Sequence, residues 1–139
     1  MTIRFLLDTN ALSEPLRPRP DPGFMRRLER RRDEISTAAP VWHELLFGAL
    51  RLPAGARRSL VEKYLESVLR GNLVIYPYDA RAAEWHAEER ARLVRLGKTP
   101  PFVDGQIAAI AAINDLEIVT TNLEDFRGFH GVKATDWRS

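Results

Sequence analysis

The chain has 139 residues, 45% of them hydrophobic and 29% charged, with a formal net charge of +2. These values are typical of one globular domain, which we expect to span residues 1–139. The chain contains no cysteine, which excludes disulfides and thiolate metal sites and favours a cytoplasmic protein. The apolar start is too short for a signal peptide, and the longest later apolar run, residues 107–113, is too short to cross a bilayer. We therefore expect no membrane association.

The first half of the chain alternates segments that are typical of strands and of helices. Residues 3–7 form an apolar run, which predicts a strand buried on both faces of a sheet. Asp21 and Pro22 are typical of a helix start, and this helix is expected to run to about residue 32. A short strand over residues 35–38, a helix over 40–52 and an amphipathic helix over 56–69, closed by Gly71, are expected next.

The second half continues the alternation. A strand is expected over residues 72–76, and Asp79 is expected to cap a long polar helix that ends near Gly97. After two prolines the sequence predicts a helix over residues 104–114, a strand over 116–120 and a short last strand over 132–135. Strands that alternate with helices predict an α/β fold, with a central parallel sheet covered by helices on both faces.

Two of the predicted strands end in polar side chains. Asp8 directly follows the first strand, with Thr9 and Asn10 next in the sequence. The strand near residue 120 ends in a second polar group, made of Thr120, Thr121, Asn122 and Asp125. In open parallel sheets, ligands bind beyond the carboxyl ends of the strands. Because an unpaired carboxylate beside a buried strand is costly, we expect Asp8 to have a stabilising partner there.

Four acidic residues are candidates for this rim, and each also has an ordinary structural explanation. Asp8 would form a turn or cap the segment over residues 11–16, and Asp104 would cap the helix that it opens. Asp125 would form a turn in its loop. Glu44 would be a solvated surface residue, opposite an apolar helix face made of Trp42, Leu45, Leu46, Ala49 and Leu50.

The four acids indicate more as a group than each does alone. If they converge, their repulsion must raise their pKa values or be relieved by a cation. Oxygen ligands favour Mg²⁺ or Mn²⁺ over Zn²⁺, and the histidines at positions 43, 86 and 130 show no spacing typical of a metal site. A carboxylate site of this kind suits hydrolysis of phosphate esters.

The order of the motifs resembles that of PIN-domain ribonucleases, and most closely the VapC and FitB type toxins of bacterial toxin–antitoxin pairs. The matching segments, which extend over essentially the whole chain, are "LLDTNALSEPLR", "HELLFGA", "VDGQIAAIAA", "IVTTNLEDF" and "VKATDW". The resemblance implies a parallel sheet of about five strands and an endoribonuclease that depends on Mg²⁺ or Mn²⁺. It also implies a homodimer that is neutralised by a small antitoxin. The toxin would contact operator DNA only through that antitoxin.

The resemblance also implies roles for individual residues. Asp8, Glu44 and Asp104 match the first three acids of the family, which are catalytic and hold the metal. For the fourth acid we favour Asp125 over Asn122, since family members use one position or the other. Supporting polar positions are matched by Thr9, Asn10, Thr120 and Asn122, whereas Thr121 stands where arginine is common.

Seven arginines lie between residues 17 and 32, against two acids. Arginine suits forked recognition of phosphate, although such a run is also typical of a solvated helix face. Helical spacing places Arg26 with Arg30, and Arg27 with Arg31. We expect one of these pairs to border the acidic pocket and bind RNA phosphates, while Phe24 and Leu28 face the core.

Three other functions compete with that of a ribonuclease. A phosphatase of the haloacid dehalogenase type needs a second aspartate at position 10, where the chain has Asn10. A response-regulator receiver needs paired acids and a lysine after the last strand, and neither is present. The third alternative is a catalytically weak PIN-like module that binds RNA or protein without cleavage. Because all four acids are retained, the sequence favours the enzyme.

Overall fold

The structure is a computed structural model that describes residues 2–139. Its centre is a sheet of five parallel strands in the order β3-β2-β1-β4-β5. The strands are β1 (Phe5–Leu7), β2 (Ile35–Ala38), β3 (Val74–Tyr76), β4 (Glu117–Val119) and β5 (Ala134–Thr135). The predicted five-stranded parallel sheet is therefore confirmed.

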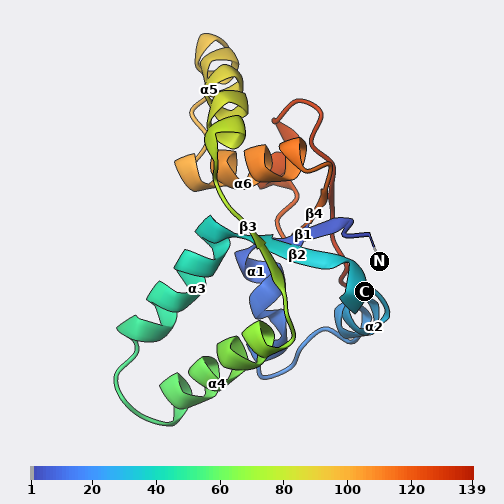
Figure 1. Cartoon of the computed structure of the whole chain (residues 1–139), viewed down its shortest axis with the longest axis vertical. Coiled ribbons are helices and arrows are strands. Elements are labelled where there is room, and N and C mark those ends of the chain that lie inside the picture. Colours follow the sequence, from blue (N-terminus) through green and yellow to red (C-terminus); the bar gives the residue numbers. More distant parts are fainter. Residues whose placement is uncertain (1) are drawn as a thin grey trace.

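Helices cover both faces of this sheet. They are α1 (Thr9–Ser13), α2 (Pro22–Arg30), α3 (Ala39–Arg51), α4 (Ala56–Arg70), α5 (Ala80–Arg95), α6 (Phe102–Ile113) and α7 (Glu124–Arg127), with short 3₁₀ turns η1 (Glu14–Leu16) and η2 (Arg32–Glu34). Figure 1 shows α5 and α6 on one side of the sheet and α1, α2 and α4 on the other. Of the helices in residues 2–139, none is both long and apolar enough to cross a membrane.

The strand order creates a topological switch point beside β1. The chain passes from β1 to β2 and β3 in one direction, and then returns to place β4 on the other side of β1. Connections that leave neighbouring strands in opposite directions open a crevice beyond their carboxyl ends. Asp8 follows β1 and Thr120 follows β4, so the two polar groups predicted at the rim flank this crevice.

Two buried hydroxyls reinforce the strand that carries Asp8. Ser36 and Thr37 in β2 are fully buried. Their hydroxyls donate to the carbonyls of Phe5 and Leu7, each at 2.8 Å. A buried hydroxyl without such a partner would be destabilising. These bonds fix β1 and β2 up to the residue that precedes Asp8.

Several predicted helix ends are confirmed, but the start of α6 was predicted wrongly. Asp21 caps α2 by accepting a hydrogen bond from the Phe24 backbone N–H. Asp79 caps α5 in the same way, with the backbone N–H of Ala82. In contrast, α6 begins at Phe102, and its first turn closes between the Gly105 N–H and the Pro101 carbonyl. Because a proline needs no N–H partner at a helix start, the helix begins directly after Pro101. Asp104 is therefore in the first turn and is not the N-cap.

The apolar face predicted for α3 is also partly wrong. Leu46 and Leu50 are 39% and 61% exposed, and the buried side consists of Val41, Leu45 and Ala49. Figure 1 shows α3 and α4 as a hairpin that extends away from the sheet. Since the hairpin has no second layer over its outer side, part of its apolar surface stays exposed.

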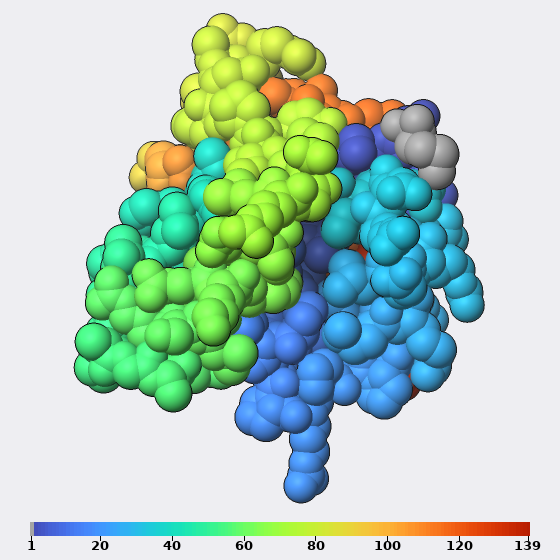
Figure 2. Space-filling model, turned by 60° about the horizontal axis from the view of Figure 1, so that its bottom comes forward, coloured from blue at the N-terminus to red at the C-terminus, as the bar shows by residue number. Residues whose placement is uncertain are grey.

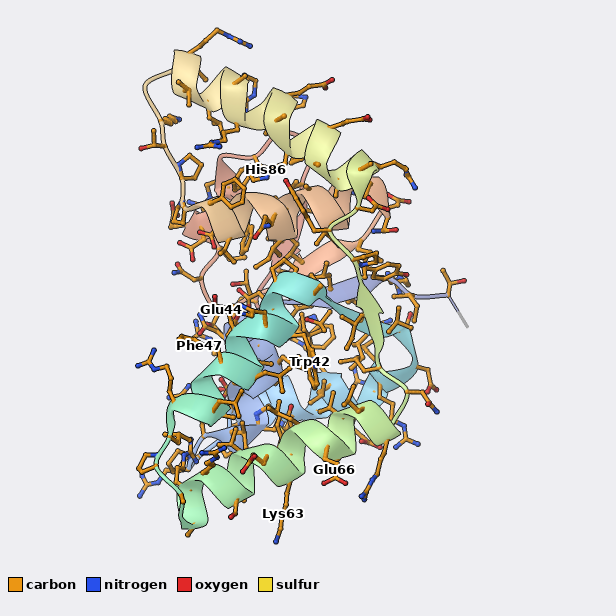
Figure 3. All side chains as sticks on the ribbon, turned by 60° about the vertical axis from the view of Figure 1, so that its left-hand side comes forward. Trp42, Glu44, Phe47, Lys63, Glu66 and His86 are labelled. Carbon is orange, nitrogen blue, oxygen red and sulfur yellow. The ribbon has the colours of Figure 1, made fainter. Side chains whose placement is uncertain are left out.

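α5 and α6 approach each other closely at Gly105. An added Cβ at this residue would lie 2.2 Å from Nε2 of His86, a buried side chain that Figure 3 shows between the two helices. The other ring nitrogen, Nδ1, is 2.8 Å from the hydroxyl of Tyr78. Burial, and to a lesser extent the charge of Arg90, lowers the pKa of His86, which favours the neutral ring.

We predict opposite effects for alanine at two helical glycines. Gly105→Ala should lower the free energy of unfolding by roughly 1–3 kcal/mol, since the fixed His86 ring must move. A Cβ added at Gly48 in α3 has no atom within 4 Å, so Gly48→Ala should raise the free energy of unfolding by about 0.5–1 kcal/mol through helix propensity. Urea denaturation measures both. Equal effects of the two substitutions would contradict the close approach of α5 and α6.

Candidate active site at the carboxyl ends of the strands

Asp8 is held in place by the start of α1. Its side chain is 6% exposed and accepts a 3.0 Å hydrogen bond from the Ala11 N–H, so it is the N-cap of α1. Burial raises the pKa of Asp8, while hydrogen bonds from Thr120, Ala11 and Asn10 act against this increase. The fold thus supplies donors for the buried carboxylate and still leaves its ionised form costly.

Thr120 connects the ends of β1 and β4. It is fully buried, its side chain bonds to Asp8, and its hydroxyl accepts a 2.9 Å bond from the Asn122 N–H. Asn122 therefore contributes its backbone N–H to the site, and the residue itself is exposed to solvent. Thr9 and Asn10 form the first turn of α1, where the Asn10 N–H also bonds to Asp8.

Asp104 lies in the first turn of α6 and is half-buried. Burial raises its pKa to about 6, and the charges of Asp125 and Asp8 act in the same direction. Asp125 also raises the pKa of Asp8. The structure therefore brings three of the predicted acids, Asp8, Asp104 and Asp125, into one electrostatic cluster.

Glu44 is not part of this cluster as the side chains stand. Its side chain is 44% exposed, and its carboxylate lies 3.8 Å from Nδ1 of His43. The pKa values of Asp8 and Asp104 are raised by other acids and not by Glu44. Figure 3 shows Glu44 and Phe47 projecting from α3 away from Trp42. The helix that carries Glu44 packs against α1 and α6, and the catalytic role of Glu44 stays a prediction.

The donor chemistry of the cluster fits a hard divalent cation. All its side-chain donors are carboxylate oxygens that repel one another, which is the environment Mg²⁺ neutralises. Within residues 2–139, no three acidic or histidine side chains are close enough to surround one ion. Mg²⁺ keeps several waters and is often held by only one or two carboxylates, so Asp8 and Asp104 suffice as protein ligands.

The structure does not bring the α2 arginines to the acids. Arg27, Arg30 and Arg31 line a separate cavity of about 340 Å³ with Phe5 and Glu117, which are the first residues of β1 and β4. Figure 1 shows α2 beside the amino ends of the strands. Arg26 is exposed on the same helix. Phe24 is buried and Leu28 packs against the core, as predicted.

Sequence reasoning missed two supports of the site. Thr37 holds β1 from the neighbouring strand, and two consecutive hydroxyl residues in a buried strand are a detectable signal. His86 packs against the helix turn that carries Asp104. It lies in the stripe of α5 that also contains buried Ala82 and Leu93, and this helical spacing indicates a core position.

The chain combines a five-stranded parallel sheet with an aspartate cluster at the switch point of that sheet, and comparisons with known proteins identify its family. The PIN domain family matches residues 5–130. The chain is 28% identical over 136 residues to a tRNA(fMet)-specific endonuclease VapC of Salmonella typhimurium, covering 97% of this chain and 98% of that protein. It is 31% identical over 124 residues to Toxin FitB of Neisseria gonorrhoeae, covering 87% and 89%.

Solved structures agree with these sequence relatives. The structure of FitAB bound to a DNA fragment superposes with a TM-score of 0.87 at 28% identity, covering 97% of this chain and 96% of that one. The protein belongs to the PIN-domain family, among the VapC and FitB toxins of toxin–antitoxin systems, whose members are named as endonucleases or ribonucleases.

The raised pKa of Asp104 predicts how the metal-free protein responds to pH. The pKa of Asp104 is about 6 in the folded protein and 3.8 for a solvated aspartate, so between these values the folded state binds a proton that the unfolded state has lost. Ionisation of Asp104 therefore lowers the free energy of unfolding as the pH rises from the lower value to the higher one. Asp104→Asn should therefore melt higher than the wild type in EDTA at pH 7.5, with a smaller advantage at pH 4.5. The gain should be on the order of 1 kcal/mol, since the group is half exposed.

Thermal melts at both pH values measure this effect, and Asp33→Asn is the matched control. Asp33 is exposed in the short turn η2, which leads into the amino end of β2, so its substitution should change neither melt. A variant at position 104 that melts below the wild type at both pH values would show that this carboxylate stabilises the fold.

Proposed function

We propose that this protein is an endoribonuclease that depends on Mg²⁺ or Mn²⁺ and acts in the cytoplasm as the toxin of a toxin–antitoxin pair. The observation that carries the proposal is the convergence of Asp8, Asp104 and Asp125, with the pKa of Asp104 raised to about 6. Three repelling carboxylates at a switch point require a cation for their ionised form. The nuclease names of the relatives support RNA as the substrate.

In this proposal the chain itself supplies position and charge. Asp8 and Asp104 would hold the ion, with Asp125 and Glu44 orienting its water ligands. A divalent ion supplies Lewis-acid activation of water and neutralises charge on the leaving oxygen. Thr120 and the N–H groups of α1 keep the Asp8 carboxylate in one orientation. Since donors that are already oriented need no reorganisation during reaction, this holding is a catalytic contribution of the fold.

We predict that Asp8→Asn or Asp104→Asn reduces RNA cleavage by at least about a hundredfold, as expected for loss of a key electrostatic contributor. Initial rates on a labelled single-stranded RNA, with and without Mg²⁺ or Mn²⁺, measure the effect. Asp115→Asn, at the far end of α6, should cleave at the wild-type rate. Near-normal rates in both active-site variants would rule out the proposed site.

The same assay addresses the fourth acid. Asp125→Asn should raise the Mg²⁺ concentration that gives half-maximal rate, because it removes a charge that acts on both other aspartates. Asn122→Ala should not, since Asn122 contributes its backbone N–H. The reverse result would assign the fourth position to Asn122. Metal-dependent binding of RNA without any cleavage would instead favour the non-cleaving PIN-like module.

Two apolar surfaces support protein partners. A groove of about 750 Å³ lies between α2 and α4, lined among others by Leu12, Met25 and Val68. Figure 2 shows this hollow between the green atoms of α4 and the light-blue atoms of α2. On α3, Leu46, Phe47 and Leu50 are exposed. We assign the groove to an antitoxin and the α3 surface to a second copy of the chain. Any contact with operator DNA is proposed to occur through the antitoxin.

Two substitutions should separate these partners. Val68→Glu puts a charge into the groove and should abolish co-purification with the proposed antitoxin when the two are co-expressed, while the mass of the toxin alone stays that of a dimer. Leu50→Glu should lower this mass and leave co-purification intact, since it charges only the α3 surface. Pull-down and light scattering measure the two effects. Loss of both interactions in either variant would contradict the assignment.

A further inference from the structure

A second group of side chains lies beside the acids and is not used by the proposed metal chemistry. Phe102 is the first residue of α6, two positions before Asp104, and its side chain is 50% exposed. The guanidinium carbon of Arg90 lies 5.3 Å from the centroid of its ring. An aromatic ring with a cation at this distance forms a cation–π pair. The pair therefore adjoins the helix turn that carries Asp104.

The ring of Phe102 is supported from behind. Its centroid is 4.8 Å from that of buried His86, which in turn is held by Tyr78 at 2.8 Å. Two prolines, Pro100 and Pro101, precede it and restrict the backbone. The ring is therefore held in one place while half of its surface remains open, which is the arrangement of a stacking platform.

A small cavity adjoins this platform. Its volume is about 130 Å³, and its lining includes His86, Arg90, Thr99, Pro101, Phe102 and Phe129. For comparison, an apolar cavity of about 150 Å³ holds one benzene ring. The cavity is therefore close to the size that holds a single six-membered ring, which favours a pyrimidine base over the larger purine.

The charge beside the cavity suits a nucleic acid. Arg92 on the same helix pairs with Glu89, whereas Arg90 has no carboxylate partner among residues 2–139. An unpaired guanidinium can contact a phosphate or stack on a base. A cation here would also offset part of the repulsion between RNA and the aspartates at the rim, whereas Arg27, Arg30 and Arg31 line a separate cavity at the amino ends of β1 and β4.

We propose that Phe102, Arg90 and the adjoining cavity form a subsite for one unpaired pyrimidine base of the RNA, next to the phosphate that is cleaved. The base stacks on Phe102, and Arg90 contacts the neighbouring phosphate. Proteins that recognise single-stranded RNA commonly stack splayed bases on aromatic and arginine side chains. The subsite rests on the proposed ribonuclease function and adds a base preference to it.

The test measures binding without cleavage. Fluorescence anisotropy of labelled oligouridylate and oligoadenylate is recorded in EDTA for the wild type, Phe102→Leu and Phe102→Trp. Phe102→Leu should weaken oligouridylate binding by roughly 5- to 100-fold, the range for losing one stacked base, and should change oligoadenylate binding much less. Phe102→Trp should retain the binding and the preference. Unchanged oligouridylate binding in Phe102→Leu would overturn the subsite.

Leu69→Ala is the matched control for loss of exposed apolar surface. Leu69 is 50% exposed, as Phe102 is, but it lies on α4 and lines neither the cavity beside Phe102 nor the groove between α2 and α4. Its substitution should leave RNA affinity unchanged. An equal loss of RNA affinity in both variants would overturn the subsite. So would a change of molecular mass in Phe102→Leu, which would place the ring between two copies of the chain.

The two proposals fail in different ways. If the uridylate preference depends on Phe102 but no metal supports cleavage, the subsite is retained and the nuclease is rejected. If cleavage depends on Asp104 but Phe102→Leu binds and cuts like the wild type, the nuclease is retained and the subsite is rejected.

Discussion

The rest of the site depends on the burial of one carboxylate, that of Asp8, at the switch point of the sheet. Burial alone would favour its neutral form, and the fold counters this with the first N–H groups of α1 and the hydroxyl of Thr120. Those donors come from both sides of the crevice, one after β1 and one after β4. A metal site built on Asp8, as proposed, would therefore inherit the rigidity of the two central strands.

The other acids are positioned by packing between helices. Asp104 reaches the crevice because α6 begins directly after Pro101 and because Gly105 lets α5 approach as far as the ring of His86. A shift of α6 would move a charge that is coupled to both other aspartates. The stability of the α5–α6 contact and the electrostatics of the site are thus parts of one arrangement.

Charge poses the opposite problem for the proposed RNA substrate, because a polyanion would have to approach a group of aspartates. The arginine-rich stretch in α2 is the densest basic segment of the chain, yet three of its members surround a cavity at the amino ends of β1 and β4. Arg90 on α5 lies beside Phe102, close in sequence to Asp104. In the proposed subsite, recognition of RNA near the cut would therefore depend on a single well-placed cation and an aromatic ring more than on the number of arginines.

The sequence by itself determined the features that are set by local chemistry. The apolar run before Asp8 and the polar residues after Val119 identify two buried parallel strands and the rim between them, and Asp21 and Asp79 mark helix starts because a side-chain cap needs only neighbouring residues. Only the tertiary structure decided which acids meet. It brings Asp125 to Asp8 and Asp104 but leaves Glu44 beside His43, because these distances depend on how helices far apart in the chain pack against one another.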